Sequence, residues 1–358
     1  MFNSFGEIFR FTTFGESHGK AIGVVVDGVP AGIDFDEKFL NSELDRRRPG
    51  KNRFATQRKE TDTPEVLSGV FDGKTTGTPI AIVIFNKDQK SKDYSNIKDI
   101  FRPGHADFTY YFKYGIRDYR GGGRSSARET AARVAAGAVA KMILKEFNIE
   151  IEAGVIEIGG IRATKIDYEY AKTSPLFALD SEVEKEWIKL IDKARNEHNS
   201  LGGVVKLRIK NLPIGLGEPI YYKLDNILAS AIVSINAVKG VYIGNTKAHK
   251  LTGLENNDEI SKDGFLSNNA GGILGGISNG EDVEVEIYFK PTPSIFKPQK
   301  SIDINGNEVE VNLKGRHDPI VAIRGSVVAE AMAACVVADM LMLNATRTID
   351  RLKKAYFK

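Results

Sequence analysis

The chain has 358 residues, of which 42% are hydrophobic and 27% charged, a balance typical of a globular protein with a sizeable core. Its 50 lysines and arginines face 47 aspartates and glutamates, and a net charge of +3 excludes the broad basic field of a nucleic-acid-binding surface. No Pro- or Ser-rich linker divides the sequence, so we expect a single domain over residues 1–358.

The most apolar stretch, residues 327–343, is interrupted by Glu330 and Asp339 and does not resemble a membrane span. The N-terminus lacks the basic start and apolar centre of a secretory signal. Cys335, the single cysteine, lies in the apolar stretch and is expected to be a small core residue in a reducing compartment. We therefore predict a cytoplasmic protein without a membrane or nucleic-acid partner.

In chain order, the first polar cluster is Glu16-Ser17-His18-Gly19, directly before an apolar β-branched run. That run predicts a buried strand, which places His18 at the mouth of the strand. His18 is interpreted either as a functional group or as a plain turn residue.

A helix is predicted over residues 36–46, and Pro49 and Gly50 end it. Arg47, Arg53 and Arg58 are then left on an ordered loop. Such a loop suits an anion site or the phosphate of a nicotinamide dinucleotide, although a charge run is more often a solvated face.

Residues 66–71 and 79–85 predict a hairpin or meander, and residues 86–101 an exposed polar loop or lid. A rigid turn with Arg102, His105 and Asp107 follows. Its H-x-D spacing resembles a metal site, but the nearby arginines disfavour a bound cation.

The stretch 117–147 combines three glycines, a predicted capping box and an Ala-rich run. Ser126 and Glu129 have the capping-box spacing, so a helix is predicted to begin near Ser126. Arg117, Arg120, Arg124 and Arg128 surround this helix end, which predicts a site for a phosphate or carboxylate. The alternative is a solvated basic turn before a core helix. Apolar residues lie on every face of the run, and Gly137 permits the close approach of another element.

The second half predicts strands in 149–163, 203–210, 240–245 and 282–289, helices over 181–198 and 224–238, and a hairpin over 302–311. A second basic turn, residues 315–319, precedes another all-round apolar helix, 325–343. This echo of the first half suggests an internal duplication with paired core helices between sheets. The alternative is that any large domain has two core helices.

Four motifs together resemble the chorismate synthase family, and they cover nearly the whole chain apart from residues 164–200. They are GESHGKAIGVVVDGVPAG, RPGHAD, RDYRGGGRSSARET, and GRHDP followed by VAEAMA. The resemblance implies an α+β fold, a single-domain sandwich of antiparallel β-sheets around central α-helices, assembled as a homotetramer.

The resemblance also implies a lyase of the shikimate pathway to aromatic amino acids. It would remove phosphate from 5-enolpyruvylshikimate 3-phosphate in a 1,4 anti elimination that gives chorismate and needs reduced FMN. Arginines and histidines suit such a substrate, because guanidinium groups pair with phosphate and carboxylate and imidazole titrates near neutrality. No G-x-G-x-x-G follows a predicted strand, so we expect NADPH to act indirectly through a separate flavin reductase.

By the same resemblance, His18 would protonate the departing phosphate, His105 would stabilise the anionic form of the reduced flavin, and Asp318 would work with flavin N5. The flavin site would comprise Arg124, Ser125, Ser126, Asn236, Ala237, Gly275, Lys290, Pro291, Thr292, Pro293, Ser294 and Arg316. The substrate anions would be held by Arg47, Arg53, Arg102 and Arg128, with Arg47 and Arg53 as alternative contacts for NADPH.

Two other functions are weighed from the residues. A phosphotransferase using the glycine-rich helix start is disfavoured because the sequence has neither a G-x-x-x-x-G-K-[ST] run nor an acidic metal pair. An RNA-binding module is disfavoured by the near-zero net charge and by the lack of an aromatic stacking signature.

Overall fold

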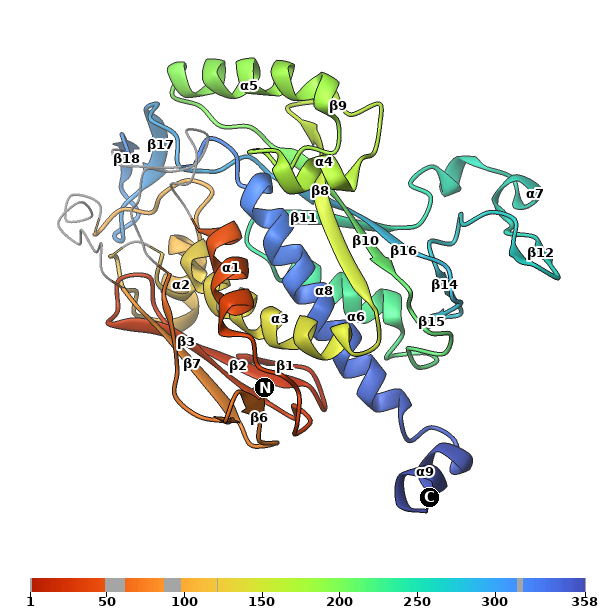
Figure 1. Cartoon of the computed structure of the whole chain (residues 1–358). Helices are drawn as coiled ribbons and strands as arrows, with labels where there is room; N and C mark the ends of the chain where they lie inside the picture. The colour runs from red at the N-terminus through yellow and green to blue at the C-terminus, as the bar shows by residue number, and fades with distance from the viewer. Residues whose placement is uncertain (1, 49–61, 87–97, 121, 314–317, 358) are drawn as a thin grey trace.

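The computed structural model describes residues 2–48, 62–86, 98–120, 122–313 and 318–357, and it contains two five-stranded antiparallel sheets with helices between them (Figure 1). The first sheet has the order β1 (Ser4–Phe5), β2 (Arg10–Gly15), β3 (Ala21–Asp27), β7 (Ile80–Phe85), β4 (Pro64–Val66). The second has the order β11 (Val238–Ile243), β16 (Val283–Phe289), β10 (Gly203–Lys210), β8 (Glu150–Ile158), β9 (Ile161–Arg162). The predicted α+β sandwich is confirmed.

Strands β10 and β16 alternate between apolar and polar residues, which sets one face of the second sheet toward the helices. In β16, Val283, Val285 and Ile287 are buried, whereas Glu284 lies on the other face and pairs with Lys206 of β10 at 2.6 Å. One continuous hydrophobic cluster includes residues of both sheets and of the helices between them.

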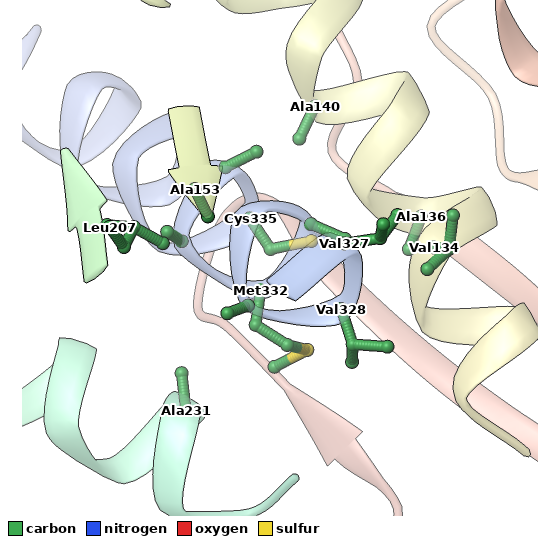
Figure 2. Packing of buried hydrophobic residues seen from close by; sticks show 14 of the residues in the cluster. Val134, Ala136, Ala140, Ala153, Leu207, Ala231, Val327, Val328, Met332 and Cys335 are labelled. Atoms are coloured by element: carbon green, nitrogen blue, oxygen red, sulfur yellow. The ribbon is translucent and has the colours of Figure 1, made fainter. Parts of the chain in front are cut away.

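Two long helices form the centre of this layer. The first, α3 (Thr130–Lys145), packs on β2, β3 and β7, and the second, α8 (Ala322–Asn344), packs on β8 and β10. They also pack against each other, with Val327 and Cys335 of α8 near Ala136 of α3 (Figure 2). By length and composition α8 is apolar enough to cross a membrane, but 83% of its most apolar window is buried in the protein, so it is a core helix.

Shorter elements surround this layer. α1 (Glu37–Arg47) packs on α3 and α8, and α6 (Leu224–Val233) packs on α8 and β11. The other α-helices of the described residues are α2 (Asp107–Tyr114), α4 (Tyr168–Thr173), α5 (Ser181–Asn196), α7 (Gly253–Asn256) and α9 (Ile349–Tyr356). The same residues form the small ribbons β5–β6 (Val70–Phe71, Lys74–Thr75), β12–β13 (Ile260–Ser261, Gly264–Phe265), β14–β15 (Ile273–Leu274, Ile277–Ser278) and β17–β18 (Gln299–Ile302, Glu308–Val311).

Most predicted elements are confirmed, two differ in extent or pairing, and one lies largely outside the described residues. The predicted hairpin after residue 66 is the pair β4–β7, with the β5–β6 ribbon inserted between its strands. The helix predicted over 224–238 ends at Val233, because Val238 already pairs with Phe289 in the sheet. The predicted loop or lid lies largely outside the described residues, since 87–97 are not among them.

The predicted helix start near Ser126 is confirmed, but the first turn is 3₁₀ and the predicted capping box with Glu129 does not form. Two 3₁₀ turns, Gly123–Ser125 and Ala127–Glu129, precede α3, which begins at Thr130. Ser126 does cap the second turn, accepting the backbone N–H of Arg128 at 3.3 Å. Glu129 instead forms an ion pair with Arg133 at 2.8 Å, one turn further on. The arginine competes for the carboxylate that the capping box requires.

The two halves share part of their topology. In the first sheet, β7 lies between β3 and β4, and in the second sheet β16 lies between β10 and β11. In both sheets, therefore, the last strand in the sequence is inserted between the two strands that precede it. A helix follows the third strand in both halves, and α3 and α8 end them. The first two strands are placed differently, since β2 neighbours β3 but β8 neighbours β10. This partial correspondence agrees with an internal duplication, which stays a prediction.

A buried group of four charges joins the helices at the centre of the layer. Arg46 of α1 donates to Glu330 of α8 at 2.7 and 2.8 Å and to Glu43 at 2.8 Å. Lys141 of α3 donates to both glutamates at 2.6 and 2.7 Å. Burial would raise the pKa of Glu330, but Lys141 and Arg46 lower it to about 2. Two charges of each sign balance, so this quartet links α1, α3 and α8 without a net charge.

The close contact between α3 and α8 at Gly137 can be tested by substitution. A Cβ added to Gly137 would lie 2.4 Å from the Cβ of Ala331 and 2.5 Å from its Cα. We expect Gly137→Ala to lower the free energy of unfolding by about 1–3 kcal/mol, because the helices must separate. Urea denaturation measures this. Gly253→Ala is the control, because its Cβ meets nothing within 4 Å; equal effects of the two substitutions would contradict the close approach.

Candidate active site

A cavity of about 420 Å³ lies where the N-terminal ends of the two core helices approach the loops of both halves. Thr130, the first residue of α3, and Gly325 and Val328 in the first turns of α8 form part of its wall. Helix N-termini carry partial positive charge, so both helices favour an anion here. The predicted residues that line the cavity are His18, Arg47, Arg102, His105, Ser125, Ser126, Arg128, Asn236, Ala237, Lys290, Thr292, Pro293, Ser294 and Asp318.

Two arginines of the cavity share one buried aspartate. Arg47, at the end of α1, donates to Asp62 at 3.0 Å, to Ala127 O at 2.7 Å and to Thr130 Oγ1 at 3.2 Å. Arg128 donates to the other oxygen of Asp62. Burial would raise the pKa of Asp62, but the charges of Arg47 and Arg128 outweigh burial and hold the pKa below its ordinary value.

A second aspartate is shared in the same way. Arg102 makes a bidentate contact with Asp107 at 2.7 and 2.8 Å, and Arg117 lies 3.3 Å from the same carboxylate. Burial raises the pKa of Asp107, and the hydrogen bonds and charges of the two arginines lower it further than burial raises it. Asp107, which has the H-x-D spacing with His105, therefore serves as a counter-ion for the two arginines.

The cavity carries an excess of positive charge. Arg324 of α8 pairs with Asp318, and Lys290 donates to Gly104 O at 3.0 Å. The cations that line the cavity are Arg47, Arg102, Arg128, Arg324 and Lys290, and their partners include the carboxylates of Asp62, Asp107 and Asp318. Arg117 lines a second cavity instead. Among the described residues these five cations exceed the three carboxylates by two positive charges, and a bound anion would reduce their mutual repulsion.

His105 is neutral in this arrangement. Its Nδ1 contacts the carbonyl of Pro103 at 3.0 Å and must donate, since a carbonyl only accepts. Nε2 then accepts the hydroxyl proton of Ser294 at 2.8 Å. Burial and the charge of Arg102 lower the pKa of His105 to about 4.

His18 lies on the turn between β2 and β3 and is buried, with 5% of its surface exposed. The turn is closed by the hydrogen bond from Gly19 N to Glu16 O at 3.1 Å. The Ser17 hydroxyl lies 3.1 Å from Nδ1 of His18. His18, which was predicted to lie at the end of a buried strand, therefore forms part of the cavity wall.

On the cavity wall, Oδ1 of Asn236 and Oγ1 of Thr292 are buried without a hydrogen-bond partner in the described part of the chain. The Nδ2 group of Asn236 donates to Ser125 O at 2.9 Å, which fixes its amide with Oδ1 as the unused acceptor. A buried polar atom without a partner is costly, so a ligand with polar groups fits this wall.

The structure does not bring every predicted residue into the cavity. Arg124 donates to Thr13 Oγ1 at 2.9 Å and lines a neighbouring cavity of about 160 Å³. Gly275 lies in the β14–β15 turn, and Pro291 does not line the cavity although its neighbours do. Arg53, Arg58 and Arg316 lie outside the described residues.

Sequence reasoning missed three residues of this site: Asp62, Asn86 and Arg324. Arg324 had a weak signal, as the one charged residue in the first turns of an apolar helix. Asp62 and Asn86 had none, because their partner Arg128 lies 66 and 42 residues away in the sequence.

The shared aspartate gives a stability prediction. Asp62→Asn leaves Arg47 and Arg128 buried without their counter-ion, so the free energy of unfolding at pH 7 should fall by about 3–5 kcal/mol. Because the folded pKa of Asp62 is lowered, this contribution is present above the unfolded pKa and is lost as the pH falls through the folded value. Urea denaturation at several pH values measures both effects. Asp34→Asn, at an exposed ion pair with Lys74, is the control; an equal effect there would refute the argument.

The environment of His105 predicts its titration. In the ligand-free protein its ring should remain neutral down to about pH 5, whereas the urea-unfolded chain should protonate near 6.5. The unfolded chain therefore binds more protons between these values, and stability should fall as the pH drops from 6.5 toward 4. NMR of ¹³C-labelled histidine follows the ring directly. A folded-state midpoint near 6.5 would show that burial and Arg102 do not control it.

Comparisons with known proteins agree on one family. The family model described as chorismate synthase matches residues 9–342. A chorismate synthase of Nitratiruptor sp. is 70% identical over 355 residues, covering 99% of both chains, and one of Aliarcobacter butzleri is 65% identical over 99% of this chain and 100% of that one. A crystal structure of chorismate synthase has a TM-score of 0.76 at 34% identity, covering 98% of this chain and 97% of that chain. The chain therefore belongs to the chorismate synthase family.

Proposed function

We propose that the protein is a lyase that eliminates phosphate from 5-enolpyruvylshikimate 3-phosphate to give chorismate, in a 1,4 anti elimination dependent on reduced FMN. The observation that carries this proposal is the cavity in which Arg47, Arg102 and Arg128, each held by a shared aspartate, lie beside two histidines. The substrate carries a phosphate and two carboxylates. A site with an excess of positive charge complements these groups.

The cavity also fits a flavin mononucleotide. Its volume lies within the range of about 300–1,000 Å³ found for small-molecule sites. The unused acceptor of Asn236 and the hydroxyl of Thr292 supply polar contacts for a ring and a polyol chain. Lys290 and Arg324 add positive charge on the same wall. When bound, reduced FMN would supply electron density to the elimination and accept the C6 proton, a step that side chains perform poorly.

The chain's own residues would bind, orient and protonate the substrate. Arg47, Arg102 and Arg128 hold the anionic groups, and their shared aspartates keep the guanidinium groups in place before the substrate arrives. His18 delivers a proton to the leaving phosphate. Its Nδ1 is engaged by Ser17, so Nε2 is the atom we assign to that transfer.

His105 is neutral before ligands bind, so its proposed role requires a change of charge. A negative group placed beside the ring would favour the protonated form and raise the pKa of His105 from about 4. His105 would then stabilise an anionic ligand only after the ligand is present. Asp318, paired with Arg324, remains an acceptor on the same wall.

The source of reducing equivalents belongs to the same proposal. Arg47, an alternative contact for NADPH, is 2% exposed and already makes three contacts with Asp62, Ala127 and Thr130. Because the same guanidinium group is assigned to the substrate anions, competition for it favours delivery of reduced FMN by a separate flavin reductase, with NADPH acting indirectly. We also propose a cytoplasmic homotetramer, in keeping with the resemblance described above.

An anaerobic assay tests the function. We expect chorismate absorbance to appear with 5-enolpyruvylshikimate 3-phosphate and photoreduced FMN, and little with NADPH plus oxidised FMN until a flavin reductase is added. His18→Ala and His105→Ala should fold normally and lose turnover by about 100-fold or more. No product with photoreduced FMN would overturn the proposed reaction. Comparable aerobic turnover with FMN and NADPH alone would overturn the proposed reductant.

A further inference from the structure

Asn86 lies directly after β7, between the turn that carries His18 and the arginines of the cavity. It does not line the cavity. Resting on the proposed function, we propose that Asn86 is a positioning residue that fixes the His18 turn and couples it to anion binding by Arg128.

The donor end of the amide holds the turn. Nδ2 of Asn86 donates to Glu16 O at 3.0 Å and to Gly19 O at 2.9 Å. These carbonyls belong to the first and last residues of the four-residue turn that contains Ser17 and His18. The backbone N–H of Asn86 also donates to Lys20 O at 3.1 Å. Both ends of the turn are thus attached to β7, which fixes the backbone from which the imidazole projects.

The acceptor end faces the anion site. Oδ1 of Asn86 accepts from Nε of Arg128 at 3.0 Å, and Arg128 shares Asp62 with Arg47. A continuous hydrogen-bonded chain therefore runs from Arg47 through Asp62, Arg128 and Asn86 to the His18 turn. A negative ligand that moves the Arg128 guanidinium also moves the amide that holds the turn.

Asparagine is well suited to this position, because one planar group must donate twice and accept once. The contacts also determine its orientation, since a flipped amide would set its oxygen against two carbonyl oxygens. Aspartate retains an acceptor for Arg128 but loses both donors. Alanine loses all three side-chain contacts. The two substitutions therefore separate the function of the turn from that of the arginine.

The experiment compares Asn86→Asp and Asn86→Ala with wild type, and uses Asn226→Asp as a matched control. Asn226 is exposed on α6, where its Nδ2 donates to Tyr221 O at 2.8 Å, outside the cavity. The first readout is the ¹³C-histidine NMR spectrum of the ligand-free protein, in which His18→Gln identifies the His18 signal. The second is anaerobic steady-state kinetics, and melting curves confirm that each variant is folded.

We expect the His18 ring signals to shift in both Asn86 variants and to stay unchanged in Asn226→Asp. kcat should fall by up to about 100-fold in both. KM for the substrate should rise in Asn86→Ala, which loses the acceptor for Arg128, and rise further in Asn86→Asp, whose carboxylate keeps an acceptor but adds a negative charge beside Arg128.

His18 signals in either folded Asn86 variant that coincide with those of wild type would overturn the positioning role. Equal KM values in the two variants would overturn the coupling to Arg128. The NMR result does not depend on turnover, so an inactive wild type would refute the proposed reaction while the spectra still decide the role of Asn86.

Discussion

The site depends on a buried carboxylate that serves two guanidinium groups at once. Asp62 binds Arg47 and Arg128, and Asp107 binds Arg102 and Arg117. One carboxylate for each arginine would neutralise the guanidinium groups and weaken the attraction of the cavity for an anion. No carboxylate would leave like charges packed together in a low dielectric, at a cost of several kcal/mol per charge. Sharing gives an intermediate state, in which each arginine is held in place and each pair keeps one unbalanced positive charge for a ligand.

The helix layer transmits this arrangement to the rest of the fold. Arg46 and Arg47 are neighbours at the end of α1, yet Arg46 enters the neutral quartet with Lys141 and Glu330, whereas Arg47 enters the cavity. The quartet attaches the end of α1 to both core helices and, through the backbone N–H of Ala153, to β8. The position of Arg47 is therefore determined by contacts within the core, and the N-termini of α3 and α8 reach the cavity from the same layer.

Sequence reasoning predicted the parts of the site that depend on local motifs. His18, His105, Ser126 and Asp318 each lie in a short turn beside a strand or helix, and such turns are visible as glycine, proline and charge next to an apolar run. It failed where the outcome depends on partners distant in the chain. Arg124 belongs to the same basic run as Arg128, but its side chain reaches Thr13 of β2 and so faces a different cavity. The capping box predicted for Ser126 and Glu129 does not form, because Arg133 takes the carboxylate of Glu129. Both outcomes required knowing which groups the fold brings within hydrogen-bonding distance.

The position of Cys335 has a practical consequence for experiments on this protein. The chain has one thiol, and it is fully buried in α8 beside α3, where burial raises its pKa. A thiol reagent can react only when the helix layer opens, because the reactive thiolate needs both solvent access and deprotonation. The rate of modification of the unlabelled native chain therefore reports how often α3 and α8 separate. The fold thus contains an intrinsic probe of core opening at the layer that supports the active site.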